Sequence, residues 1–411
     1  MKKTTITLKR DFSIMPDPVK ICFLADRHHL FDDRIYWKMA VPLVLKGFEV
    51  YYFLIGNKNS SGITKEGVNY KIWKAKTFSR NQWINFLIKR LNPNNNYRKL
   101  FEEASALKAD IYHFHDLWIN RIGVKLKNLG HRPVVFYDAR EPYAEDYMSY
   151  GKKVMALPTR IFAYWVDRWE KKQAMNYDLV IANESLVQQN FARIIGKERS
   201  VVLFNYSDRY LNMNHDKDQV KEYDLIYSGT ITRLRGAMNT LKAVKIIQNE
   251  IPNLKCLFIG TYYPDSLKDE MNSFLKQNCL EKNVVLHEAV PYQEIGYYYS
   301  RSKIGLLILE RVKTYEISMP IKLFDYMTFG LPIIGSNFGH INSYITEDNC
   351  GITVDPSDPV EVAGAIIRLL KDEKLYSMLS KNARKAADSK YNWENEFQKL
   401  LGYYQKALNE R

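Results

Sequence analysis

The chain has 411 residues, 46% of them hydrophobic and 26% charged, with a formal net charge of +14. This length exceeds one ordinary hydrophobic core and predicts two domains of roughly 200 residues each. No stretch approaches the roughly 18 uninterrupted apolar residues of a membrane span, and no apolar segment follows the basic N-terminus as in a secretory signal. The four cysteines show neither metal-binding nor disulfide spacing, so we expect a protein of the reducing cytoplasm.

The positive charge lies almost entirely in the first half of the chain. Residues 1–216 hold 35 Lys and Arg against 22 Asp and Glu, whereas residues 217–411 hold 25 against 24. Such one-sided charge indicates an anionic partner surface. Segments 83–100 and 158–175 mix aromatic and basic residues, as helices lying on anionic membranes do. Ordinary amphipathic helices with a solvated basic side are the alternative, and nucleic acid is not expected because no known binding module appears.

Short apolar strands alternate with amphipathic helices along the whole chain, a pattern typical of parallel α/β domains. Helices are expected at 34–46 and 185–195, each followed by a glycine that can end it. Strands are predicted at 20–25, 49–55, 111–115, 133–139, 178–183 and 201–205, and again at 224–229, 256–260, 283–290, 303–309, 331–336 and 351–355. The sequence therefore predicts two tandem Rossmann-like, doubly wound domains.

Residues 206–223 form a polar break between these two series of strands. We expect a first domain at 1–208, a linker at 209–223 and a second domain at 224–390. The acidic run Asp216-Lys217-Asp218 falls in this linker rather than after a strand, so we interpret it as solvated charge and predict no metal site there. Doubly wound sheets bind ligands at the carboxyl ends of their strands, and a cleft between the domains is the expected site.

The stretch SMPIKLFDYMTFGLPIIGS, residues 318–336, predicts a short helix of about ten residues. Ser318 can serve as its N-cap, and Pro320 suits the first helical turn, where a missing N–H has no cost. Gly330 can adopt the left-handed conformation that ends a helix. Lys322 and Asp325 then lie one turn apart near the start of this helix.

The start of a helix attracts anions through its free N–H groups and its dipole. Lys322 adds a full positive charge there, and Asp325 can accept hydrogen bonds from ligand hydroxyls. This arrangement predicts a phosphate near Lys322 and a ribose or another sugar near Asp325. The alternative is a surface ion pair between the two residues, which would contribute only a few tenths of a kcal/mol.

Several motifs together resemble the GT-B glycosyltransferases, in particular the retaining glycosyltransferase family 4 and its bacterial polysaccharide branch. Residues 26–50 resemble its first strand, loop and helix, residues 134–147 its YDxHE strand end, residues 227–236 its glycine-bearing loop and residues 391–408 its last helix. The pattern P-x-K-L-F-[ED]-Y-M-x-x-G-x-P is matched at Pro320, Lys322, Leu323, Phe324, Asp325, Tyr326, Met327, Gly330 and Pro332.

The resemblance implies a GT-B fold with a cleft between its two domains, and a C-terminal helix at 391–411 that packs back on the first domain. It also implies that the second domain binds the nucleotide-sugar donor, with catalytic roles for Lys322 and Arg235 against the donor diphosphate. The donor-binding residues it implies are Gly229, Thr230, Arg233, Arg235, Lys322 and Asp325. Thr230 stands where the family has an arginine, and Arg233 is expected to reach the same oxygens. Arg233 and Arg235 could instead be solvated loop residues.

Two acidic residues spaced E-x7-E bind the sugar and the ribose in this family. Asp325 matches the second of them. The first falls at Ile317, so the resemblance implies a catalytic role for Glu316, one residue away, with Glu310 as the weaker candidate.

The acceptor is implied to bind at the first domain. Arg140 stands where the YDxHE motif has its histidine, and Arg140 and Glu141 are expected to take part in catalysis, Arg140 by binding a phosphate or carboxylate. His113, His115 and Asp116 end the preceding strand and could contact the acceptor or the donor sugar. The alternative is that the two histidines face opposite sides of the strand, with only one of them in the cleft.

The loop after the first strand contains His28, His29, Asp32, Asp33 and Arg34. We expect His29 and Asp33, with His115 and Arg140, to bind the acceptor. Asp33 and Arg34 could equally cap the following helix.

The favoured function is transfer of a sugar from a nucleotide sugar to a saccharide or lipid-linked saccharide, with retention, in cell-surface polysaccharide synthesis. No metal and no cofactor are expected. The expected location is cytoplasmic, with peripheral association at the inner face of the membrane through the basic first domain. The alternative is a catalytically weakened GT-B protein that only binds a nucleotide sugar or a saccharide.

Overall fold

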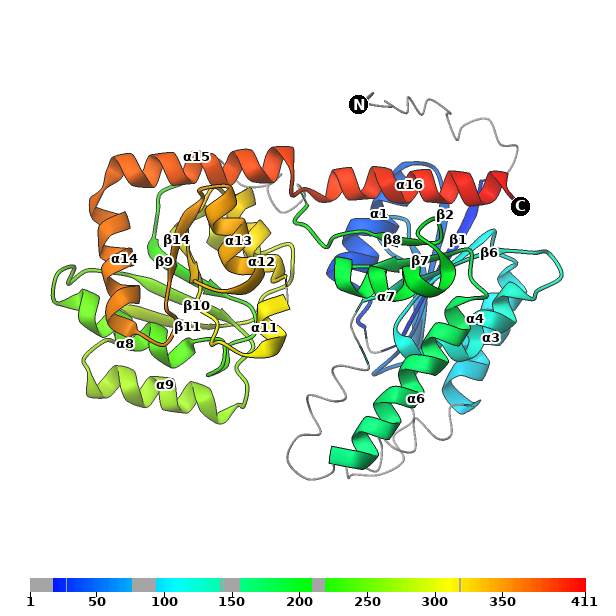
Figure 1. Cartoon of the computed structure of the whole chain (residues 1–411), viewed down its shortest axis with the longest axis horizontal. Coiled ribbons are helices and arrows are strands. Elements are labelled where there is room, and N and C mark those ends of the chain that lie inside the picture. The colour runs from blue at the N-terminus through cyan, green and yellow to red at the C-terminus, as the bar shows by residue number, and fades with distance from the viewer. Residues whose placement is uncertain are drawn as a thin grey trace. The chain divides into compact units, whose positions relative to one another are not determined.

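The computed structural model describes residues 18–26, 28–75, 94–140, 143, 156–208, 219–317 and 319–411. The chain forms two compact units, which Figure 1 shows. The first comprises Met1–Asn205 together with Asn395–Arg411, and the second comprises Tyr206–Glu394. The predicted acidic run at 216–218 lies outside the described residues. None of the described helices is both long enough and apolar enough to cross a membrane.

The first unit is built on an eight-stranded sheet in the order β3-β4-β2-β1-β5-β6-β7-β8. All neighbouring strands are parallel except β3 and β4, which form an antiparallel edge. The central strands are buried on both faces, as parallel strands covered by helices must be. The strands are β1 (Lys20–Asp26), β2 (Glu49–Gly56), β3 (Ser60–Ile63), β4 (Asn69–Lys74), β5 (Ile111–His115), β6 (Val134–Ala139), β7 (Leu179–Ala182) and β8 (Ser200–Val202).

Helices connect these strands. A π-helix, η2, follows β1 and begins at the side chain of Asp32, which accepts hydrogen bonds from the backbone N–H groups of Arg34 and Ile35. The helices are η2 (Asp33–Ala40), α1 (Val41–Leu45), α3 (Asn94–Leu107), η3 (Leu117–Ile119), α4 (Asn120–Lys127), α6 (Ala156–Ala174) and α7 (Ser185–Ile195).

The last helix, α16 (Trp393–Asn409), belongs for most of its length to the first unit. The Tyr404 hydroxyl lies 2.6 Å from Nδ1 of His113 on β5. Glu396 accepts a 3.1 Å hydrogen bond from the backbone N–H of Phe204, just after β8. These contacts join the C-terminus of the chain to the middle and to the edge of the first sheet.

The second unit is built on a six-stranded, fully parallel sheet in the order β11-β10-β9-β12-β13-β14. The strand order reverses between β9 and β12, so their carboxyl ends flank the position where such sheets bind ligands. The strands are β9 (Tyr223–Ser228), β10 (Cys256–Gly260), β11 (Val284–Glu288), β12 (Ser302–Leu307), β13 (Ile333–Ser336) and β14 (Gly351–Val354).

Two helix layers cover this sheet. In one layer α8 packs against α9 and α14, and in the other α12 packs against α15. The helices are α8 (Ala237–Gln248), α9 (Ser266–Gln277), α10 (Ile295–Ser300), α11 (Lys313–Ile317), α12 (Ile321–Thr328), α13 (Gly339–Glu347), α14 (Pro359–Lys371) and α15 (Glu373–Ser389). The predicted doubly wound α/β architecture is confirmed.

Tyr326 fixes α12 against the sheet. Its hydroxyl accepts a 3.2 Å hydrogen bond from the backbone N–H of Ser228 and lies 3.3 Å from the carbonyl oxygens of Ile226 and Leu306. Its ring lies against Gly305 of β12, where an added Cβ would come within 2.4 Å of the ring. Glycine is therefore required at this point of the strand for the helix to approach so closely.

We expect Gly305→Ala to lower the free energy of unfolding by about 1–3 kcal/mol, because the new methyl group must displace the Tyr326 ring and with it α12. Chemical denaturation followed by circular dichroism measures this change. The matched control is Gly364→Ala on the exposed side of α14, where an added Cβ meets no atom within 4 Å. That variant should gain roughly 0.5–1 kcal/mol from helix propensity. Equal effects of the two substitutions would contradict the tight packing of α12.

Candidate active site

The loop between β9 and α8 starts and ends with glycines of positive φ. Gly229 has φ +95° and Gly236 has φ +78°. A Cβ at Gly236 would come within 1.9 Å of the Ile308 carbonyl oxygen, so only glycine allows the loop to pass this close to the end of β12. The loop therefore lies at the reversal of strand order, and α8 begins from it.

Lys322 points from the first turn of α12 to the end of β9. Its Nζ donates a 3.2 Å hydrogen bond to the carbonyl oxygen of Ser228 and lies 4.2 Å from the centre of the Tyr227 ring. The Tyr227 hydroxyl in turn donates to the carbonyl oxygen of Arg235, at 2.7 Å. The alternative of a surface ion pair between Lys322 and Asp325 is therefore wrong, because Lys322 bonds to the strand end and Asp325 is buried at 6% exposure.

Burial and the nearby charge of Arg235 lower the pKa of Lys322 to about 7. Among the described residues, no carboxylate lies within ion-pair distance of the Lys322 ammonium group. A lysine beside a second cation, with no acid to balance either charge, is typical of a site prepared for an anion. The residues Lys322 and Arg235, which the resemblance implied to act together, do come together in the structure.

Arg233 and Thr230 do not share this position. Arg233 is exposed and forms an ion pair with Glu270 of α9, and Thr230 is an exposed loop residue. The expectation that Arg233 replaces the family's arginine at the same oxygens is therefore not supported, since its guanidinium group already has a carboxylate partner.

The two candidates for the first acidic residue differ in their surroundings. Glu316 is exposed on α11, 3.8 Å from Arg311, and a Cβ on Gly339 would come within 2.3 Å of its carbonyl oxygen. Glu310 follows β12, and its Oε1 accepts a 2.5 Å hydrogen bond from the Asn239 side chain. Glu316 is thus the acid whose carboxylate is more accessible. Ser318, the predicted N-cap, lies outside the described residues, and Pro320 takes the N-cap position of α12.

A second cluster of charged residues lies at the carboxyl ends of β1, β5 and β6 in the first unit. His28 lies between two carboxylates, with its Nδ1 2.9 Å from Asp32 and its Nε2 3.0 Å from Asp116. Nη1 of Arg140 lies 3.2 Å and 3.3 Å from the two ring nitrogens and 3.5 Å from Asp32. Asp116 has a φ of +76°, an uncommon backbone conformation that is concentrated at functional sites.

The cations of this cluster are held in their charged forms. Burial alone would lower the pKa of His28, but the hydrogen bonds to Asp116 and Asp32 outweigh it and raise the pKa to about 9. Burial likewise opposes the charge of Arg140, but the carboxylates of Asp32, Asp33 and Asp138 outweigh it and raise its pKa. His28 is therefore protonated at neutral pH and cannot act as a base there.

Two residues predicted to bind the acceptor lie outside this cluster, and the residue before each of them lies in it. His29 is exposed, and Asp33 pairs with Lys38 at 3.7 Å, so neither belongs to the cluster. Their neighbours His28 and Asp32 do belong to it, because the Asp32 side chain caps η2 and the loop turns at that residue. Glu141 lies outside the described residues. The capping residue expected at Asp33 was thus one position too late.

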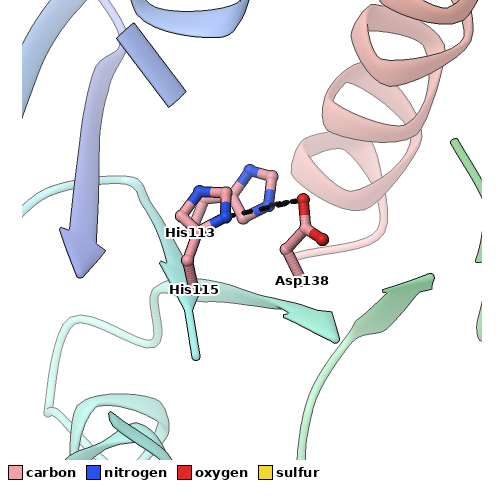
Figure 2. A group of neighbouring side chains, drawn as sticks. All are labelled: His113, His115 and Asp138. Carbon is pink, nitrogen blue, oxygen red and sulfur yellow. Dashed lines mark ion pairs between the residues drawn. The ribbon is translucent and has the colours of Figure 1, made fainter. Parts of the chain in front are cut away.

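Beneath this cluster lies a fully buried group, His113, His115 and Asp138, which Figure 2 shows. The two histidine rings stack at 4.8 Å, and His115 Nδ1 and His113 Nε2 lie 3.5 Å and 3.9 Å from the same Asp138 oxygen. The alternative that the two histidines face opposite sides of β5 is therefore wrong, since residues two apart on a strand share a face. Because His115 is completely buried, the structure does not place it where an acceptor could reach it.

These three residues are also the described group whose ligand atoms, all within 4.8 Å of one another, could hold a metal ion. Burial lowers the pKa of His113 to about 4 and holds that of His115 well below its usual value, so both are neutral. However, Nε of Arg34 donates a 3.0 Å hydrogen bond to the same oxygen of Asp138. The charge of Arg34 already balances this carboxylate and would repel a metal cation, so the residues fit a buried ion pair better than a metal.

Comparison with known proteins identifies the kind of enzyme. Residues 211–386 match the family model described as glycosyl transferases group 1. The capsular polysaccharide biosynthesis glycosyltransferase CapM of Staphylococcus aureus is 23% identical over 61% of this chain and 67% of its own length. The chain is a GT-B glycosyltransferase.

Solved structures agree with this fold. Sucrose-phosphate synthase from Thermosynechococcus elongatus superposes with a TM-score of 0.68 at 15% identity, over 96% of this chain and 100% of that one. Anabaena Alr3699/HepE in complex with UDP superposes with a TM-score of 0.67 at 13% identity, over 94% and 100%. The family match in this glycosyltransferase includes Lys322 and Arg235 but not the His28 cluster.

Because the pKa of Lys322 is lowered in the folded protein, we expect the free energy of unfolding to depend on pH. Between pH 7 and pH 10 the unfolded chain binds a proton at this lysine that the folded chain does not, so the free energy of unfolding rises with pH over this window. Relative to Lys322→Met, the wild-type protein should gain roughly 1 kcal/mol per pH unit there. Denaturant titrations of both proteins at several pH values measure the difference. A difference independent of pH would show that Lys322 is an ordinary exposed lysine.

Proposed function

We propose that this glycosyltransferase moves a sugar from a nucleotide-sugar donor to a saccharide or lipid-linked saccharide during synthesis of a cell-surface polysaccharide. The observation that carries the proposal is the meeting of Lys322 and Arg235 at the end of β9, beside the first turn of α12. Two cations and the free N–H groups of a helix match the charge and geometry of a diphosphate.

Two comparisons support this choice of substrates. Anabaena Alr3699/HepE has been solved with UDP and with UDP-glucose. CapM carries the name of a capsular polysaccharide biosynthesis enzyme. A nucleoside diphosphate sugar with its diphosphate at Lys322 and Arg235 is the donor that fits both the charge of the site and these relatives.

In the proposed reaction the bond between the sugar C1 and the diphosphate breaks, and its electron pair stays on the diphosphate oxygen. The acceptor hydroxyl oxygen forms the new bond to C1 from the same face, and its proton passes to the leaving phosphate oxygen. Lys322 and Arg235 stabilise the negative charge that grows on the diphosphate. With the donor bound, the diphosphate restores the proton of Lys322, and the two cations supply the charge neutralisation that a metal ion would otherwise provide, so we propose transfer without a metal.

The protonation states of the side chains in the His28 cluster support transfer with retention. An inverting reaction needs a general base at the acceptor hydroxyl. His28 and Arg140 are protonated at neutral pH, and His115 is buried. The carboxylates of Asp32 and Asp116 are already engaged by His28. Within the described part of this edge, no side chain is prepared to act as a base, which favours proton transfer to the leaving phosphate itself.

The acceptor is proposed to bind at the His28 cluster. In this cluster the carboxylates of Asp32 and Asp116 lie next to the charged donors His28 and Arg140. Such groups form hydrogen bonds with the hydroxyls of a saccharide. Arg140 contacts Asp32 and lies within 3.3 Å of both ring nitrogens of His28. We therefore propose that it positions the cluster rather than binding a phosphate or carboxylate of the acceptor.

Helix α6 supports the proposed contact with an anionic membrane. One side of the helix is buried through Ala163 and Val166, yet Ile161, Tyr164 and Trp165 on another side are 61%, 62% and 55% exposed. Basic residues border this exposed face, namely Arg160, Arg168, Lys171 and Lys172. An ordinary amphipathic helix has only one apolar side. The second, exposed apolar side of α6 therefore favours a helix that lies at a membrane interface. Residues 83–93 of the other predicted segment lie outside the described residues.

A screen of UDP-, GDP-, ADP- and dTDP-sugars should find one donor that raises the melting temperature of the protein, because binding stabilises the folded state. Lys322→Met and Arg235→Met should each weaken its binding at least about tenfold, the loss expected for a charge-assisted hydrogen bond. Lys303→Met is the matched control, since Lys303 pairs with Asp224 at the opposite end of the sheet. No shift with any nucleotide sugar would refute the donor site.

Turnover of the same donor distinguishes an active transferase from a catalytically weakened protein that only binds the donor. An active transferase slowly releases the sugar to water or passes it to a lipid-linked acceptor, and the anomeric configuration of the product, read by proton NMR, tests retention. Tight binding without any turnover on lipid-linked acceptors would instead favour the binding protein.

The membrane contact predicts sedimentation with vesicles that contain phosphatidylglycerol but not with vesicles of phosphatidylcholine alone. The triple variant Ile161→Ser, Tyr164→Ser, Trp165→Ser should lower vesicle affinity by at least about tenfold, since each apolar side chain contributes on the order of 1–2 kcal/mol when buried.

The control for this experiment replaces two exposed apolar residues of the second unit, Val285→Ser and Val360→Ser, which are 40% and 66% exposed. This variant should bind the vesicles as the wild-type protein does. Equal binding by the α6 variant and the control would exclude α6 as the contact.

A further inference from the structure

The amine of Lys322 has unusual surroundings for a lysine. It is half-buried and contacts a carbonyl oxygen and the face of Tyr227. Among the described residues, Arg235 from the β9–α8 loop and Tyr227 from β9 are the ionisable groups that act on or contact it, and Asp325 lies one turn further along its own helix. Arg235 is the charge that acts on it, and within the described residues no carboxylate forms an ion pair with it.

A lysine in such surroundings loses its proton easily. Burial and the charge of Arg235 lower the pKa of Lys322 to about 7, so much of this side chain is a neutral amine at pH 7.5. A neutral amine is a nucleophile, and desolvation next to another cation is a known way to activate a lysine. In the same place, Arg235 and the N–H groups at the start of α12 remain available to bind a phosphate group.

We propose that Lys322 is a modification site for acyl phosphates, whose phosphate binds at Arg235 and the start of α12 while the amine of Lys322 takes the acyl group. The inference rests on the proposed function, because it uses the anion site assigned there to the donor diphosphate. It adds a covalent regulation of that site. The class of reagent is a small carboxylic–phosphoric anhydride such as acetyl phosphate.

The step balances without any further reactant. The Lys322 nitrogen attacks the carbonyl carbon and forms a C–N bond, while the C–O bond to phosphate breaks. The electron pair of that bond leaves with the phosphate, and the nitrogen releases one proton to water. The product is a neutral amide at Lys322 and free phosphate. The amide carries no charge and fills the place of the ammonium group, so acylation blocks donor binding, and a bound donor protects the lysine.

The expected selectivity follows from two opposing effects. At pH 7.5 the neutral fraction of an amine with a pKa of 7 exceeds that of an ordinary lysine by roughly 500-fold. Its lower basicity reduces its intrinsic reactivity by about 30-fold, if amines follow the dependence known for thiolates. Lys322 should therefore react about tenfold faster than exposed lysines, before any gain from phosphate binding.

The test incubates the full chain with acetyl phosphate at pH 7.5 and measures acetylation at each lysine by peptide mass spectrometry over time. Lys46 on the first unit and Lys276 on the second, both exposed, are the internal references. We expect Lys322 to react about tenfold faster than these, and UDP to slow Lys322 alone. Arg235→Met should lower the rate at Lys322 toward that of the references, since it removes the phosphate contact and the smaller of the two causes of the lowered pKa, while burial remains.

Two outcomes separate this inference from the proposed function. A protein that binds a nucleotide sugar while Lys322 reacts no faster than Lys46 and Lys276 overturns the inference and leaves the donor site standing. Selective reaction at Lys322 that UDP does not slow, in a protein that binds no nucleotide sugar, supports the modification site and refutes the donor site. An acylating ester without phosphate, applied in parallel, shows how much of the selectivity depends on phosphate binding.

Discussion

The position of one ammonium group decides what the second unit can do. Lys322 lies at the end of β9 only because Tyr326, one turn later on α12, is hydrogen-bonded between β9 and β12 and packed against Gly305. Burial in this position, beside Arg235, weakens the hold of the lysine on its proton. Protonated Lys322 and Arg235 repel each other in the folded protein, and a bound anion would relieve this repulsion. This repulsion lies where the strand order reverses, at the diphosphate site proposed above.

In the first unit, by contrast, the charged groups at the carboxyl ends of β1, β5 and β6 pair with one another. Arg34 pairs with Asp138 below the surface, and His28 lies between Asp32 and Asp116 above it. The charged forms of His28 and Arg140 leave this edge without a described base, while the carboxylates remain suited to hydroxyl groups. The contrast between an unbalanced cationic site and a balanced polar edge matches the two substrates of a glycosyltransferase, one strongly anionic and one rich in hydroxyls.

Hydrophobic periodicity was sufficient to predict the two parallel sheets. The choice of Lys322 and Arg235 came instead from the family resemblance. Several details could not be predicted because they depend on contacts distant in sequence. The edge strands β3 and β4 are short, polar and half-exposed, so their pattern resembled a loop. The capping residue proved to be Asp32 rather than Asp33, and one position of shift moved the cluster from His29 to His28. Arg233 had the right charge and spacing, but Glu270, 37 residues away, holds it elsewhere. The shared face of His113 and His115 could have been predicted, since residues two apart on a strand always point the same way.

Proton uptake on donor binding tests most directly whether the diphosphate binds at Lys322. A nucleotide sugar has no phosphate that titrates near pH 8, so any proton taken up from the buffer at this pH is bound by the protein. Isothermal titration calorimetry at pH 8, in buffers of different ionisation enthalpy, counts these protons. We expect an uptake close to one proton per donor bound by the wild-type protein, because the diphosphate restores the charge of Lys322, and none by any residual binding of Lys322→Met. Donor binding without proton uptake by the wild-type protein would contradict this expectation.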